Sequence, residues 1–131
     1  MSILVDASAI VAIVHGEPEA DDFADVIESH VNRYYCAVGA WEASQAIARL
    51  KTVSLQQAAD LISSFADEAG LRLVPIGESE GREAITAAAR YGKGRHPARL
   101  NMGDCFAYAC AKTNGAELLY KGNDFAQTDL A

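Results

Sequence analysis

The sequence predicts an α/β domain in which helices surround a mainly parallel sheet of at least four strands. Short apolar runs alternate with segments of helical periodicity, and no repeat or low-complexity tract interrupts them. Such alternation is typical of parallel βα units, because a parallel strand needs a long crossover before its neighbour. The chain has 131 residues, which predicts a single domain over residues 1–131.

The first predicted strand is a short branched run at residues 3–5. Ser8 is the expected cap of a helix that ends before Gly16. Pro18 is expected to open a second helix whose acidic face is turned to water. The apolar face of this second helix is expected to contain Phe23, Val26, Ile27 and Val31.

The second strand is predicted over residues 34–38. The helix after it has a helical apolar repeat at Ala43, Ala46, Ile47 and Leu50. Ser54 and Gln57 form a capping-box pattern that opens a further helix, which Gly70 can end. The predicted inward residues of this helix are Leu55, Ala58, Ile62, Phe65 and Ala69. The two helices, between about residues 39 and 69, are expected to form a hairpin.

The third strand is predicted over residues 71–76. Pro75 favours an edge position for this strand, because proline cannot donate to the hydrogen-bond ladder. A helix is expected from Ser79 to Tyr91, and Gly92 breaks it.

The last predicted helix is the most apolar. Residues 105–111 are nearly all nonpolar, which predicts contacts on all sides, and Asn101 is the expected N-cap. Asp104 therefore lies in the first turn of a central helix. Residues 116–120 predict the fourth strand, and a turn follows over residues 122–125.

Composition and charge limit the class of protein. Half of the residues are hydrophobic and 22% are charged, which excludes the composition of a disordered chain. The net charge of −7 argues against a broadly basic surface that coats nucleic acid. Cys36, Cys105 and Cys110 form no CxxC pattern and are expected to be reduced. The start of the chain lacks a basic leader and a long apolar run, so we expect a cytoplasmic protein without membrane insertion.

Four acids are expected at one edge of the sheet, where ligands bind outside the carboxyl ends of parallel strands. Asp6 follows the first strand, and Glu42 opens the helix after the second. Asp104 opens the buried helix, and Asp124 follows the fourth strand. Each acid alone also has a structural explanation as a cap, a turn residue or a solvated side chain. Their conjunction favours function, because Asp6 and Asp104 adjoin the most apolar segments, where an unpaired carboxylate is costly.

Carboxylates held close together must bind protons or cations. Two of them about 4 Å apart repel each other by about 4 kcal/mol at an effective dielectric constant near 20. Oxygen ligands favour Mg²⁺ or Mn²⁺, whereas His15, His30 and His96 lack the spacing of a zinc site. Magnesium pairs with phosphate oxygens, so the pattern predicts metal-assisted phosphodiester hydrolysis with water as the nucleophile.

A basic strip precedes Asp104. It contains four of the eleven basic residues together with one histidine, namely Arg90, Lys93, Arg95, Arg99 and His96. As a phosphate guide, the strip would offset the repulsion between an acidic protein and a polyanion; the alternative is a solvated loop. The glycines of residues 92–95 match neither a GxGxxG nor a Gly-Lys-Ser/Thr pattern, so nucleotide binding of those types is not predicted.

Four stretches, at residues 3–10, 41–43, 91–105 and 118–125, carry a family resemblance, and the third is the most specific. In them the chain resembles the PIN-domain ribonuclease toxins of the VapC type, from bacterial toxin–antitoxin pairs. The resemblance implies a three-layer α/β/α sandwich, a homodimer and a small antitoxin protein that occupies the acidic groove.

The resemblance also implies roles for single residues. It makes Asp6 and Asp104 direct metal ligands, with Glu42 completing the acidic site and Ser8 as a supporting hydroxyl. Asp124 matches the acid before phenylalanine in the last motif. Relatives commonly carry another acid where this chain has Asn123.

The leading hypothesis is a Mg²⁺-dependent endoribonuclease toxin. In it, Asp6 and Asp104 hold the metal ion, and Glu42 with Asp124 positions or deprotonates water. The residues expected to bind RNA are Lys93, Arg95, His96 and Arg99.

Two other hypotheses remain open. One is a Mg²⁺-dependent phosphohydrolase with Asp6 as the nucleophile, although Ser8 stands where such enzymes usually have a second acid. The other is a non-catalytic binding module that uses the groove only to hold a partner.

Overall fold

The computed structural model describes all 131 residues and contains four strands and six helices. The strands are β1 (Ser2–Val5), β2 (Asn32–Cys36), β3 (Arg72–Val74) and β4 (Glu117–Leu119). The helices are α1 (Ala7–His15), α2 (Ala20–Glu28), α3 (Ala37–Lys51), α4 (Leu55–Ala69), α5 (Glu78–Tyr91) and α6 (Met102–Thr113). None of these helices combines the length and the apolar composition that crossing a bilayer requires.

The four strands form one parallel sheet in the order β3-β2-β1-β4. The chain first adds strands on one side of β1 and then places β4 on the other side, so the strand order reverses between β1 and β4. In open parallel sheets, ligands bind outside the carboxyl ends of the strands at such a reversal. The predicted parallel sheet is confirmed, and β3, the strand before Pro75, lies at an edge as predicted.

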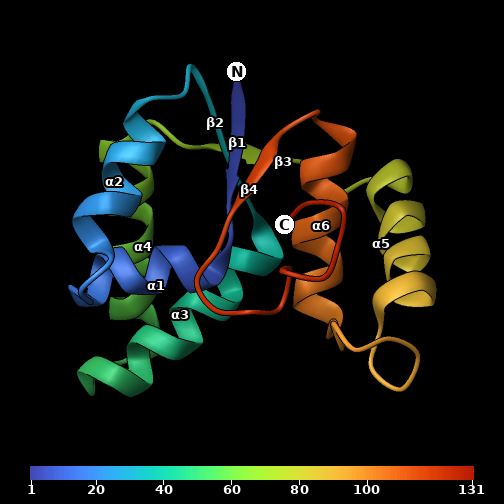
Figure 1. Cartoon of the computed structure of the whole chain (residues 1–131). Helices are drawn as coiled ribbons and strands as arrows, with labels where there is room; N and C mark the ends of the chain where they lie inside the picture. The colour runs from blue at the N-terminus through green and yellow to red at the C-terminus, as the bar shows by residue number, and fades with distance from the viewer.

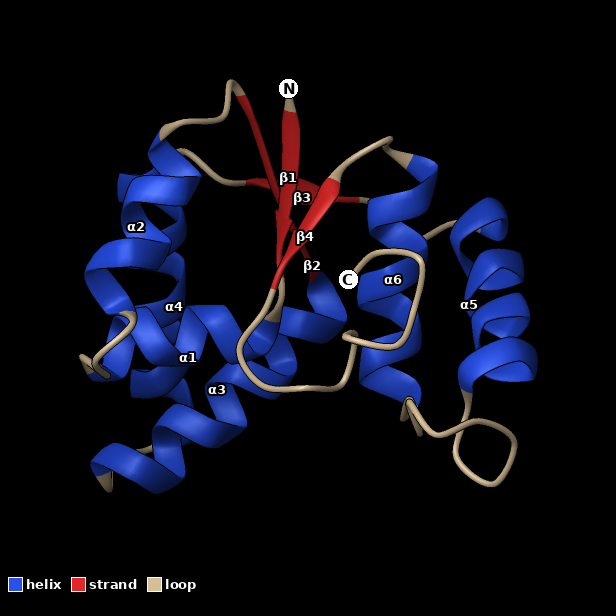
Figure 2. Ribbon diagram, in the orientation of Figure 1, coloured by secondary structure: helices blue, strands red, loops and turns tan.

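Helices cover both faces of the sheet (Figure 1). In Figure 2, α5 and α6 lie on one side of the strands, and α1, α2 and α4 lie on the other. Leu4 packs into the core on the α5–α6 side and Val5 into the core on the α1–α4 side, because successive strand residues point to opposite faces. The three-layer α/β/α sandwich is therefore confirmed.

The starts of two helices differ from the sequence-based prediction. Asp6, and not Ser8, is the N-cap of α1, so that prediction is wrong by two positions, and α5 begins at Glu78, one residue before the predicted Ser79. The pattern gives the kind of residue at a helix start but not where the backbone turns. The predicted cap of α6, Asn101, is confirmed and forms a capping box.

Strand β2 lies two residues earlier than the predicted 34–38, because residues 37 and 38 already belong to α3. The predicted inward positions at the ends of helices are also wrong. Val31 follows α2 and is 83% exposed, and Leu50 and Leu55 are about half exposed. Val31 lies outside α2, and Leu50 and Leu55 stand on either side of the turn between α3 and α4, so the apolar pattern continues at these positions without a core to cover the side chains. The hairpin of α3 and α4 is confirmed, and the three cysteines are free and buried.

Candidate active site

The four acids predicted from the sequence line one pocket at the carboxyl ends of β1 and β4. The pocket has a volume of about 440 Å³. We call it the acidic pocket, and its lining includes Asp6, Glu42, Asp104, Asp124 and the predicted supporting residue Ser8. The fold thus brings together side chains from four separate segments of the chain.

Asp6 is fixed at the junction of β1 and α1. Its Oδ2 accepts hydrogen bonds from both the backbone N–H (3.0 Å) and the hydroxyl (2.7 Å) of Ser8. The Ser8 hydroxyl oxygen in turn accepts the backbone N–H of Lys121 (2.9 Å), which belongs to the segment after β4. Ser8 therefore orients the Asp6 carboxylate and also ties down the loop that carries Asp124.

Asp104 lies in the first turn of α6 and is only 8% exposed. Its Oδ2 accepts the backbone N–H of Asn101 (3.1 Å), and the Asn101 side chain accepts the backbone N–H of Asp104 (2.9 Å). Asp104 therefore both caps α6 and lines the acidic pocket. The capping box uses only one carboxylate oxygen, which leaves Oδ1 for a ligand.

Glu42 reaches the same pocket from α3 and packs against the first turn of α6. A Cβ atom added to Gly103 would lie 2.0 Å from Glu42 Oε2 and 2.3 Å from its Cδ. Only glycine permits this approach of the carboxylate to the helix backbone. Sequence reasoning missed Gly103, because a glycine beside an acid gives no signal of a contact with a helix sixty residues away.

Burial and mutual repulsion raise the pKa values of Asp6, Glu42 and Asp104. Burial, opposed by the hydrogen bonds from Ser8, raises the pKa of Asp6. Burial and then the charges of Asp6 and Asp104 raise the pKa of Glu42 to about 7. Burial and the charges of Asp124 and Asp6 raise the pKa of Asp104 to about 6. None of the four carboxylates forms an ion pair, so the pocket favours uptake of protons or of a cation.

The donors of the acidic pocket suit a hard divalent cation. No three His, Cys, Asp or Glu side chains converge into a ready-made metal centre. Mg²⁺ does not require one, because it keeps several waters and is commonly held by one or two carboxylates together with substrate phosphates. The carboxylate donors of the pocket fit this mode of binding, whereas zinc prefers nitrogen and sulfur ligands.

The basic strip lies outside the acidic pocket. Lys93 and Arg95 line a separate groove between α5 and α6, and His96 and Arg99 line neither cavity. His96 is held within its own loop, where Nδ1 accepts the backbone N–H of Ala98 (3.0 Å). Binding of RNA by these residues stays a prediction.

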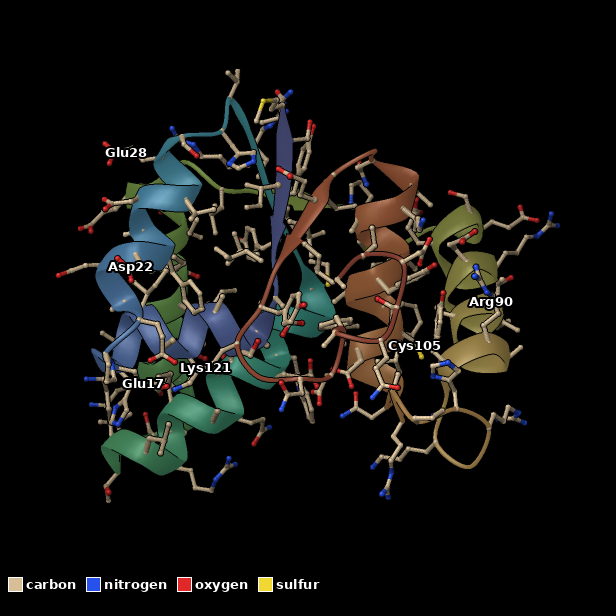
Figure 3. All side chains as sticks on the ribbon, viewed as in Figure 1. Glu17, Asp22, Glu28, Arg90, Cys105 and Lys121 are labelled. Carbon is tan, nitrogen blue, oxygen red and sulfur yellow. The ribbon has the colours of Figure 1, made fainter.

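Sequence reasoning also missed Lys121, which lines the acidic pocket. Its ammonium pairs with Glu17 and with Glu19, the latter at 3.2 Å. Figure 3 shows Glu17 and Lys121 close together beside α1. Because Lys121 pairs with these two acids, it forms no ion pair with any of the four predicted catalytic acids. The position of Lys121 in the sequence, directly before the turn that carries Asp124, could have indicated that it lies near the pocket.

Sequence comparison identifies the family. The PIN domain family matches residues 3–130, which is nearly the whole chain. The chain belongs to the PIN-domain family. This PIN domain is 41% identical to a VapC ribonuclease of Rhizobium meliloti, over 96% of the chain and 97% of that relative. It is 35% identical to a VapC ribonuclease of Mycobacterium bovis, over 98% of the chain and 96% of that relative. The predicted relation to the VapC type is thus confirmed.

Solved structures share the fold. The PIN domain superposes on Mycobacterium tuberculosis VapC20, a toxin that cleaves the sarcin–ricin loop, with a TM-score of 0.76 and 15% identity. The match covers 99% of this chain and 97% of the other. A toxin–antitoxin complex from Klebsiella pneumoniae matches with a TM-score of 0.69 and 16% identity, over 98% and 94% of the two chains.

Proposed function

We propose that this PIN domain is a Mg²⁺-dependent endoribonuclease and the toxin of a toxin–antitoxin pair. The observation that carries the proposal is the acidic pocket, in which Asp6, Glu42 and Asp104 share one site and none of them forms an ion pair. The names of the relatives, which are VapC ribonucleases, support RNA as the substrate.

Asp6 and Asp104 would hold the metal ion, and Mn²⁺ could replace Mg²⁺. Both side chains are anchored through one oxygen, Asp6 by Ser8 and Asp104 by Asn101, so their carboxylates are oriented before a ligand arrives. When bound, the ion supplies charge stabilisation for the phosphoryl oxygens and lowers the pKa of water.

Glu42 is the candidate general base. Its pKa of about 7 leaves it partly ionised at neutral pH, which is the range in which a base works best. It takes a proton from the attacking water while the water oxygen bonds to phosphorus. The phosphorus–oxygen bond to the leaving ester then breaks, and the leaving oxygen takes a proton from a solvent water molecule. Asp124, at the mouth of the pocket, would help to position the water.

The proposed partner is a cognate antitoxin protein. Support comes from the fold shared with the toxin–antitoxin complex of Klebsiella pneumoniae. A cytoplasmic location and a homodimer stay predictions of the sequence.

The test is RNA cleavage by purified protein, with Asp6→Asn as the matched variant. We expect the parent to cleave single-stranded RNA in the presence of Mg²⁺ and to be inactive in EDTA. We expect the cleavage rate of the variant to be more than ~100-fold lower than that of the parent. Equal cleavage by parent and variant, after contaminating nuclease has been excluded, would contradict the proposal.

A further inference from the structure

The acidic pocket is lined by one basic side chain, that of Lys121. The other polar residues of the lining are five acids, a serine and an asparagine. A phosphodiester that enters a pocket of this charge is repelled by every carboxylate that a bound cation does not neutralise. Lys121 is therefore the one side chain of the lining whose charge attracts the phosphate.

The backbone of Lys121 is fixed next to a proposed metal ligand. Its N–H donates to the Ser8 hydroxyl oxygen (2.9 Å), and the same hydroxyl donates to Asp6 Oδ2 (2.7 Å). The backbone N–H of Asp6 donates to the Leu119 carbonyl oxygen (2.9 Å), which holds the end of β4 to the end of β1. The base of the lysine side chain thus has a defined place near Asp6, while its flexible four-carbon stem lets the ammonium change partners.

Two glutamates hold the ammonium of Lys121 beside the pocket. The ammonium pairs with Glu17 and lies 3.2 Å from Glu19 Oε2. Glu17 also lines the pocket, and its backbone is fixed by hydrogen bonds to the Ala12 carbonyl oxygen (2.8 Å) and from the Ala20 N–H (2.9 Å). Hydrogen bonds to Glu17 and then to Glu19 raise the pKa of Lys121, so the ammonium keeps its charge.

These ion pairs are of a kind that a stronger ligand can replace. The side chain of Lys121 is 39% exposed and that of Glu19 is 37% exposed, so solvent screens their attraction. A phosphate oxygen is a strong acceptor for an ammonium group. Exchange of a glutamate for a phosphate keeps the lysine paired and adds a contact with the RNA.

We propose that Lys121 is a phosphate-binding residue of the acidic pocket and that Glu17 and Glu19 compete with the RNA for its ammonium. The proposal rests on the proposed function, since it names the side chain that holds an RNA phosphate next to the metal ion. In the free protein the ammonium pairs with the two glutamates, and in the complex it turns to a phosphate oxygen. A lysine that only ties the connection between α1 and α2 to the segment after β4 would stay with its glutamates.

The two roles of the lysine give opposite expectations for the glutamates. If the glutamates compete with RNA, Glu17→Gln together with Glu19→Gln frees the lysine and strengthens RNA binding. If the ion pairs only brace the fold, removing either side of them has the same effect on RNA binding. A cycle of four proteins separates the two cases. It comprises the reference protein, the Glu17→Gln/Glu19→Gln variant, Lys121→Met, and the triple variant.

The experiment measures binding of a labelled single-stranded RNA by fluorescence anisotropy with Mg²⁺. All proteins carry Glu42→Gln, so that the complex is not cleaved, and Glu42→Gln alone is the reference protein. Lys121→Met should weaken binding by about 10-fold, as for one charge-assisted hydrogen bond. The two glutamine substitutions should strengthen binding by about 3-fold, the size of an exposed ion pair. In the triple variant they should lose most of this effect, because no ammonium is left for the glutamates to hold.

The matched control is Lys112→Met. Lys112 is 33% exposed and pairs with Asp129, and neither residue lines the acidic pocket, so this change should leave RNA binding unchanged. A salt titration adds a readout that a bracing role would not move. In the background of Glu17→Gln and Glu19→Gln, Lys121→Met should reduce the slope of log Kd against log salt concentration by about 0.7, the value for one phosphate contact on a single strand.

Urea denaturation shows that the proteins compared are folded. Unchanged RNA binding in Lys121→Met overturns the proposal, and so do glutamine substitutions that weaken binding as much as Lys121→Met does. An equal gain from the glutamine substitutions with and without the lysine also overturns it, because net charge alone would then explain the gain. If binding depends on Lys121 but the protein with Glu42 restored does not cleave the RNA with Mg²⁺, the role of the lysine is supported and the proposed function is contradicted. No binding of RNA by the reference protein would overturn both.

Discussion

Two aspartates, Asp104 in the first turn of α6 and Asp129 packed against its later turns, have opposite surroundings. Asp104 at the start of α6 has one capping partner and no ion pair, and burial together with the charges of Asp124 and Asp6 raises its pKa to about 6. Asp129 packs against the later turns of the same helix. Its Oδ1 accepts the Tyr108 hydroxyl (2.6 Å), and its Oδ2 pairs with Lys112. Burial acts to raise the pKa of Asp129, but the hydrogen bonds from Lys112 and Tyr108 outweigh it and lower the pKa to about 2.

The difference separates a structural acid from a functional one. Asp129 is supplied with a cation and a hydroxyl, so its charge is already stabilised and it ties the end of the chain to α6. Asp104 is ordered by its cap but forms no ion pair, so a bound cation can stabilise its charge further. The partners around each carboxylate, rather than the residue type, decide which role it takes.

The largest expected effect comes from exchanging the two acids for amides. Asp104→Asn should reduce RNA cleavage by more than ~100-fold, because it removes a proposed metal ligand while the amide oxygen can still cap Asn101. Asp129→Asn should leave cleavage unchanged and lower the free energy of unfolding by about 1 kcal/mol, a value reduced by solvent screening. Cleavage rates and urea denaturation of both variants check this. An equal loss of cleavage activity in both variants would contradict the distinction between a functional Asp104 and a structural Asp129.

A smaller effect is expected from Gly103→Ala, which tests the neighbour of Asp104. The added methyl group would occupy the space of the Glu42 carboxylate and would therefore displace it from the first turn of α6. Cleavage should fall by about 10- to 100-fold, because the change moves a side chain of the site without removing a proposed metal ligand, while alanine favours the helix by about 1 kcal/mol. Thermal unfolding beside the cleavage assay separates the two effects. A variant that keeps full activity would show that Glu42 need not lie at this position.

Proton release gives the next test. Asp104 and Glu42, with pKa values of about 6 and 7, must lose protons before a cation binds. Mg²⁺ affinity should therefore rise at least about 10-fold between pH 5.5 and pH 8, with protons released on binding. Calorimetry in buffers of different ionisation enthalpy measures both quantities. An affinity that does not change with pH would contradict the link between these acids and the metal.

Glu42→Gln should stabilise the protein without metal at high pH. The pKa of Glu42 is raised in the folded state, so the folded state holds the proton more tightly and stability falls as pH rises from about 4.5 through about 7. In EDTA at pH 8 the variant should gain on the order of 1–2 kcal/mol, or roughly 3–8 °C in Tm. At pH 4 the two proteins should melt alike. A variant that melts lower at pH 8 would argue against repulsion in the pocket.

The smallest effect concerns a third acid, Glu117, which like Asp129 has a cationic partner. His30 Nε2 lies 2.5 Å from Glu117 Oε2, and Nδ1 lies 2.8 Å from the Val26 carbonyl oxygen. Glu117 and then the Val26 carbonyl raise the pKa of His30. This stabilisation is fully present below about pH 6.5 and is lost as pH rises through the folded-state pKa.

His30→Gln should therefore cost about 1 kcal/mol more at pH 5.5 than at pH 9, since Glu117 is largely exposed and solvent screens the pair. Urea denaturation at the two pH values measures the difference. A cost that is the same at both would mean that His30 packs as a neutral side chain.

The sequence predicts the acids of the pocket but not the contacts that set their pKa values. Asp6 and Asp104 could be found because each follows a recognisable strand or helix start. The approach of Glu42 to Gly103 and the pairing of Lys121 with Glu17 could not, since both join segments far apart in the chain. Helix ends were missed for a related reason. Val31 and Leu55 continue an apolar pattern beyond the sheet, and only the packed structure determines where the core stops.

We propose that the start of α6 faces a site for a divalent cation and that its later turns do not. Titration of the parent, Asp104→Asn and Asp129→Asn with Mn²⁺, followed by the loss of the free-ion paramagnetic signal, tests it most directly. We predict that the parent and Asp129→Asn bind the ion with equal affinity and that Asp104→Asn does not bind it in the same range. Equal binding by all three proteins, or no binding by the parent, would contradict the account.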